Sequence, residues 1–92
     1  MATCDEIEGE IVQGDRPYWE PLLAAVGEPL IEDFMWMFEV ALHDARCLHA
    51  YKHIMTRRYL HLDVDGNAFS FVSPNRYRPI AFPRLLRAVL AP

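Results

Sequence analysis

The sequence predicts an α+β domain: a four- or five-stranded antiparallel meander, with a short N-terminal helix and a C-terminal helix packed on one face of the sheet. Two observations predict this class. Through residues 34–80 the side chains largely alternate between apolar and polar with a period of two, which is typical of strands. Only short turns separate the strand-like segments, and short turns join antiparallel neighbours. A small curled barrel is the alternative architecture.

Length and composition indicate one folded domain. The chain has 92 residues, of which 52% are hydrophobic and 24% charged, and a chain of this length holds one core. We divide it into a flexible acidic arm, residues 1–15, and a single α+β domain, residues 16–92. The N-terminus is acidic where a secretory signal is basic, and no apolar run could span a membrane. We therefore expect a cytoplasmic protein with no membrane partner.

Two helices flank the predicted sheet. In the stretch RPYWEPLLAAVG the regular helix is expected to begin near Glu20, because Pro21 fits only the first turn, and Gly27 can end it. The C-terminal helix is expected over residues 82–92, with Pro83 in its first turn. Its apolar face consists of Leu85, Leu86, Val89 and Leu90.

Between the helices, five segments have the composition of strands. They are residues 34–42, 47–54, 59–63, 68–72 and 76–80. The stretch DVDGN, residues 63–67, contains the Asp-Gly pair that favours a tight hairpin turn. It also resembles the start of a calcium loop, but Ala68 and Pro74 occupy the positions where that loop needs Gly and Glu. A turn is therefore predicted.

The alternation assigns side chains to two faces of the sheet. One face is predicted to form the core beneath the two helices. It contains Trp36, Phe38, Val40, Leu42, Leu48, Ala50, Ile54, Leu60, Leu62, Phe69 and Phe71.

The other face is predicted to be the contact surface. The stretch LHAYKHIMTRRYLHLD, residues 48–63, places histidines and tyrosines at the opposite parity, with two arginines at their end. The predicted binding residues are His49, Tyr51, His53, Arg57, Arg58, Tyr59 and His61. Aromatic and guanidinium groups are common at contact surfaces, and neighbouring histidines should make binding depend on pH. This hypothesis requires Tyr51 and Tyr59 to share a face.

Catalysis, metal binding and cofactors are not expected. His49 and His53 would lie about 13 Å apart along one strand, which is too far to share an ion. Cys47 and His49 could pair as a nucleophile and base, but no glycine-rich amides for an oxyanion accompany them. No nucleophile elbow or phosphate loop is present. The two cysteines, Cys4 and Cys47, are too few for a disulfide scaffold and are expected to be reduced.

The predicted function is that of a non-enzymatic interaction domain, which binds a protein partner or forms a homo-oligomer through the aromatic face. Binding of single-stranded nucleic acid on the same face is the alternative, with bases stacked on the aromatic rings and Arg57 and Arg58 at the phosphates. The net charge of −4 and the pI of about 5.4 favour the protein partner.

The central stretch FMWMFEVALHDARCLHAYKHIMTRRYLHLD resembles small uncharacterised bacterial proteins that have a similar β-hairpin region. The resemblance covers residues 30–80. It implies no activity and assigns no functional residue.

Overall fold

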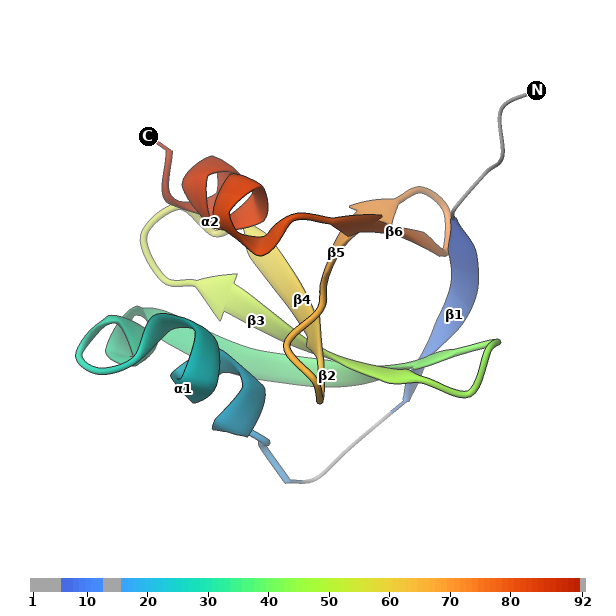
Figure 1. The fold of residues 1–92 in the computed structure, drawn as a ribbon, viewed down its shortest axis with the longest axis horizontal. Coiled ribbons are helices and arrows are strands. Elements are labelled where there is room, and N and C mark those ends of the chain that lie inside the picture. The colour runs from blue at the N-terminus through green and yellow to red at the C-terminus, as the bar shows by residue number, and fades with distance from the viewer. Residues whose placement is uncertain (1–5, 13–15, 92) are drawn as a thin grey trace.

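The chain forms a closed barrel of six antiparallel strands, in the spatial order β1-β2-β3-β4-β5-β6 (Figure 1). The structure is a computed structural model that describes residues 6–12 and 16–91. The elements in chain order are β1 (Ile7–Val12), α1 (Glu20–Val26), the short 3-10 helix η1 (Leu30–Asp33), β2 (Phe34–Leu42), β3 (Cys47–His53), β4 (Tyr59–Asp63), β5 (Ala68–Val72), β6 (Arg76–Ile80) and α2 (Phe82–Leu90).

The predicted open meander is wrong, because a sixth strand closes the sheet. That strand, β1, lies within the segment expected as an acidic arm. Gly9 of β1 is paired with Leu42 of β2, and Ile7 is paired with Tyr77 of β6. Since β1 bonds to both outer strands of the meander, it turns the sheet into the small barrel that was the alternative architecture. Residues 1–5, with Cys4, and residues 13–15 of the expected arm lie outside the described residues.

The other predicted elements are observed close to their expected bounds. The helix α1 begins at Glu20 with Pro21 in its first turn, and Gly27 follows it with a φ of 70°. The five predicted strands are β2 to β6, of which only β3 ends one residue early. The predicted turn at residues 63–67 is also present, and its Gly66 has a φ of 89°. Local sequence signals therefore located every element except β1 and η1.

Hydrophobic cores lie on both sides of the sheet. The barrel interior is filled by Val40, Leu42, Leu48, Phe69 and Tyr77, with Ile7 and Phe38 packed against them. The second core lies between the outer face of the strands and the helices. It contains Leu22, Phe34, Tyr51, Leu60, Leu62, Ala68, Leu85 and Val89. Both helices cover one side of the barrel, and β1 lies on the other side (Figure 1).

The predicted core face joins two different faces of the sheet. Leu60 and Leu62 lie beneath the helices as predicted, but Val40 and Leu48 fill the barrel interior. Leu60 is paired with Tyr51, and directly opposite residues share a face, so Leu60 belongs to the outer core with the helices. His61 is paired with Ala50 and therefore points into the barrel. The alternation rule assumes that one face of the strand is exposed to solvent. In β4, however, four consecutive residues, Leu60 to Asp63, are buried, so both faces are covered.

A bulge also divides the predicted face within β2. Trp36 is paired with Tyr51 on the outer face, and Phe38 is paired with Ala50 on the inner face. The register shifts between Trp36 and Phe38, so two residues of equal parity point to opposite sides.

Candidate binding site

The predicted binding residues do not form one surface. Tyr51 is opposite Leu60, whereas Tyr59 is opposite Lys52, so the two tyrosines project from opposite faces. The expectation of a shared aromatic face is therefore wrong. Its members fall into three places: the outer core, the turn between β3 and β4, and the barrel interior.

His49, Tyr51 and His53 belong to the outer face, where each makes a structural hydrogen bond. The fully buried Tyr51 donates its hydroxyl proton to the carbonyl oxygen of Tyr18, just before α1. His49 Nδ1 accepts a hydrogen bond from Trp36 Nε1–H at 3.2 Å. Burial lowers the pKa of His49, against a smaller opposing effect of Glu39.

His53 closes the end of β3. Its Nδ1 accepts a hydrogen bond from the backbone N–H of Thr56 at 3.2 Å, and its ring packs edge-on against Phe34 with centroids 5.0 Å apart. His49, Tyr51 and His53 are all buried, and their polar atoms serve the fold. They are not available as a contact surface.

Arg58 joins the β3–β4 turn to the end of α2. Its Nη1 donates to the carbonyl oxygens of Ala88 at 2.6 Å and Ala91 at 2.9 Å. The hydroxyl of Thr56 donates to the carbonyl oxygen of Val89 at 2.7 Å. The last carbonyls of a helix have no partner within it, so this turn caps α2. Arg57 is exposed, with a φ of 64°.

Tyr59 and His61 point into a cavity at one end of the barrel. The cavity has a volume of about 250 Å³. Its lining comes from five strands and consists of Ile11, Phe38, Tyr59, His61, Phe71 and Tyr77. The pairing of β4 with β5 stops at His61 and Phe69, before it reaches Tyr59 and Phe71. The cavity therefore lies where the barrel wall opens.

His61 lines this cavity beside the rings of Tyr59 and Tyr77, which carry hydroxyl groups. Its ring is stacked on Tyr59, with centroids 6.1 Å apart, and meets the Tyr77 ring edge-on at 5.2 Å. The residue is 4% exposed. Burial lowers the pKa of His61 to about 4, so the imidazole is neutral at pH 7. A neutral imidazole offers one N–H donor and one acceptor nitrogen.

Exposed apolar side chains and one cation lie at the edge of the cavity. Ile11 is 61% exposed and Phe71 is 52% exposed. Met35, which is 43% exposed, is opposite Lys52, and Lys52 Nζ lies 5.8 Å from the centroid of the Tyr59 ring. We call the cavity and this rim, formed by Ile11, Met35, Lys52 and Phe71, the barrel mouth.

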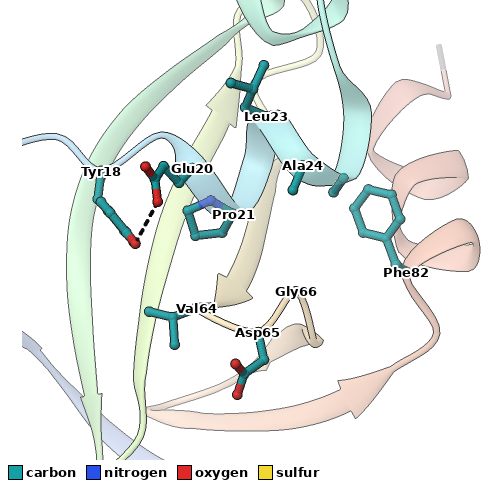
Figure 2. Close-up of a pocket in the computed structure, with 10 residues that line it drawn as sticks. Tyr18, Glu20, Pro21, Leu23, Ala24, Val64, Asp65, Gly66 and Phe82 are labelled. Atoms are coloured by element: carbon teal, nitrogen blue, oxygen red, sulfur yellow. Dashed lines mark hydrogen bonds between the residues drawn. The ribbon is translucent and has the colours of Figure 1, made fainter.

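A larger hollow of about 670 Å³ lies between α1 and the β4–β5 turn (Figure 2). Phe82 closes one side of it, and the hydroxyl of Tyr18 donates to Glu20 Oε1 at 3.2 Å within it. The carboxylates of Glu20 and Asp65 are exposed to solvent here. No polar side chain is buried among the described residues that line the hollow, so the barrel mouth is the better candidate.

Two chemistries considered for the sequence find no support in this geometry. Burial and the neighbouring Glu39 raise the pKa of Cys47, which keeps it a thiol and a poor nucleophile. Within residues 6–12 and 16–91, no group of three or more His, Cys, Asp or Glu side chains could hold a metal ion. In the same residues, no helix is long and apolar enough to cross a membrane.

Several residues of the barrel mouth were not predicted as a site. Phe38 and Phe71 were assigned to the core, and Ile11 to the acidic arm. The alternation of Ile7, Gly9 and Ile11 with glutamates is a strand signal that could have identified β1. Comparison with protein-family models, with curated proteins and with solved structures finds no match to this chain.

Proposed function

We propose that this chain is a non-enzymatic interaction domain that binds a protein partner through the barrel mouth. One observation carries the proposal: an aromatic cavity is lined in part by the exposed side chains of Ile11 and Phe71, and the exposed Met35 is paired with Lys52 at its edge. Exposed apolar groups around a hollow are typical of protein contact sites, because a partner's side chain can fill the hollow while its backbone covers the rim.

The rim favours a protein over the alternative of single-stranded nucleic acid. Bases need accessible aromatic faces beside several cations that meet the phosphates. At the barrel mouth, Lys52 is the one cation that the described residues place beside the aromatic rings. The net charge of the chain is −4, which opposes the approach of a polyanion.

Site-directed photocrosslinking in the native cell tests the proposal. Phe71 is replaced in the full chain by photoreactive benzoylphenylalanine; the matched control carries the same group at Ile54, which is 47% exposed on the β3–β4 turn. We expect a protein adduct of defined mass from position 71 that is absent from position 54 and is weakened by Ile11→Ser. Equal labelling from both positions, an RNA adduct, or an adduct of two copies of the chain would each overturn the proposal.

A further inference from the structure

An unpartnered polar group faces the cavity of the barrel mouth. The other two buried histidines have hydrogen bonds, His49 from Trp36 and His53 from Thr56. Among the described residues, no hydrogen bond reaches either ring nitrogen of His61, although the residue is only 4% exposed. In those residues the sole fully buried side-chain nitrogen or oxygen without a hydrogen bond is Arg76 Nε. The His61 nitrogens therefore keep some accessible surface, which we attribute to the cavity that they line.

The size and lining of the cavity fit one aromatic ring. An apolar cavity of about 150 Å³ accommodates benzene, so a volume of about 250 Å³ has room for a ring with a short substituent. Phe38, Tyr59 and Tyr77 offer the inserted ring stacked or edge-on contacts. A long aliphatic or charged side chain would lack these ring–ring contacts with the lining.

The chemistry of His61 selects the substituent. A carboxylate or an ammonium group would lose its hydration in this apolar site and would face a neutral imidazole. A hydroxyl group both donates and accepts, so it pairs with His61 whichever ring nitrogen carries the proton. A phenylalanine side chain would leave His61 without a partner, and an indole N–H could only donate to it.

We propose that the partner inserts a tyrosine side chain into the barrel mouth, with its ring on the aromatic lining and its hydroxyl hydrogen-bonded to His61. This inference rests on the proposed function and names the residue that the site recognises. Lys52 on the rim favours an acidic residue beside that tyrosine, since its ammonium group stands over Tyr59 at the cavity edge.

Side-chain analogues test the inference directly. The isotope-labelled full chain is titrated in an NMR experiment with p-cresol, which mimics tyrosine, and with toluene, which mimics phenylalanine. We expect both to shift the signals of Phe71 and Tyr77, and p-cresol to bind about two- to tenfold more tightly, the worth of one net hydrogen bond. The variant His61→Phe should remove this preference. Should that variant not fold, nuclear Overhauser contacts between p-cresol and the His61 ring of the unchanged protein replace it.

The outcomes separate this inference from the proposed function. Equal affinity for both compounds, or p-cresol shifts confined to Val64 and Gly66 of the larger hollow, would overturn the tyrosine inference. If the adduct from position 71 persisted in that case, the proposed function would stand. If that adduct were absent, and neither compound shifted the NMR signals of the barrel mouth, the proposed function and the tyrosine inference would both be overturned.

Discussion

Tyr51 and Tyr59 lie on opposite sides of the barrel wall, although they belong to neighbouring strands and to one short stretch of sequence. Tyr51 is opposite Leu60 and lies beneath the segment that leads into α1, where its hydroxyl binds the Tyr18 carbonyl. Tyr59 is opposite Lys52 and lines the cavity of the barrel mouth. The first tyrosine therefore attaches the N-terminal helix, and the second belongs to the candidate site.

Conservative substitution of the two tyrosines should separate these roles. Tyr51→Phe keeps the buried ring but leaves the Tyr18 carbonyl without its donor, so we expect the free energy of unfolding to fall by about 1 kcal/mol. Tyr59→Phe should change it by less than about 0.5 kcal/mol. Urea denaturation followed by fluorescence measures both values. Equal losses in the two variants would contradict the assignment of Tyr51 to the outer core.

The two adjacent arginines should also differ. Arg58→Ala removes the donor to the carbonyls of Ala88 and Ala91, so the last turn of α2 should fray and its amides should exchange with solvent severalfold faster. Arg57→Ala is the matched control. The φ of 64° at position 57 is strained for arginine and for alanine alike, so this substitution should leave α2 unchanged. Amide hydrogen exchange measured by NMR compares the two variants. Equal protection of the α2 amides in both would rule out the capping role of Arg58.

Closure of the barrel depends on the absence of a side chain at Gly9. A Cβ atom at this position would come within 2.8 Å of Leu42 Cδ2 and 2.9 Å of Val40 Cγ1. Gly9→Ala should therefore push β1 away from β2 and lower the free energy of unfolding by about 1–3 kcal/mol. Glu10→Ala, at the exposed neighbouring position, is the control and should have a small effect. A Gly9→Ala protein as stable as the unchanged chain would indicate that β1 contributes little to closure.

The sequence could predict most elements, because their signals are local. Pro21 and Gly27 delimit α1, and the Asp-Gly pair at Asp65 marks a turn that Asp63 completes by accepting bonds from the backbone N–H groups of Asp65 and Asn67. Such signals act over a few residues and need no knowledge of distant contacts.

The arrangement of the faces could not be predicted in the same way. The pairing of β1 with both β2 and β6 joins residues that are far apart in sequence. The alternation in IEGEIV indicates a strand, but nothing local to it indicates that this strand closes a barrel. The alternation in β4 gives two groups of side chains but does not say which group faces the helices, because both groups are buried. The candidate site follows from that choice, and so the sequence placed Tyr51 and Tyr59 together.

Burial of His61 should make the stability of the protein depend on pH. Its pKa is about 4 in the folded chain against 6.5 for an ordinary histidine, so between these values the unfolded chain binds more protons. The contribution of His61 to the free energy of unfolding is therefore fully present above pH 6.5. It is lost as the pH falls towards 4. This pKa shift should lower the free energy of unfolding by about 2 kcal/mol between pH 7 and pH 5.

Comparison with the variant His61→Phe isolates this contribution, since the aromatic volume is kept and the titrating group is removed. Urea denaturation at pH 7, 6 and 5 should show that the unchanged protein loses about 2 kcal/mol more than the variant over this range. His43→Gln removes an exposed histidine and should retain the pH dependence of the unchanged protein. If His61→Phe were to lose stability in parallel with the unchanged protein, His61 would have to be accessible to protons in the folded barrel. The cavity would then be wet, and selection of a neutral phenol by His61 would lose its physical basis.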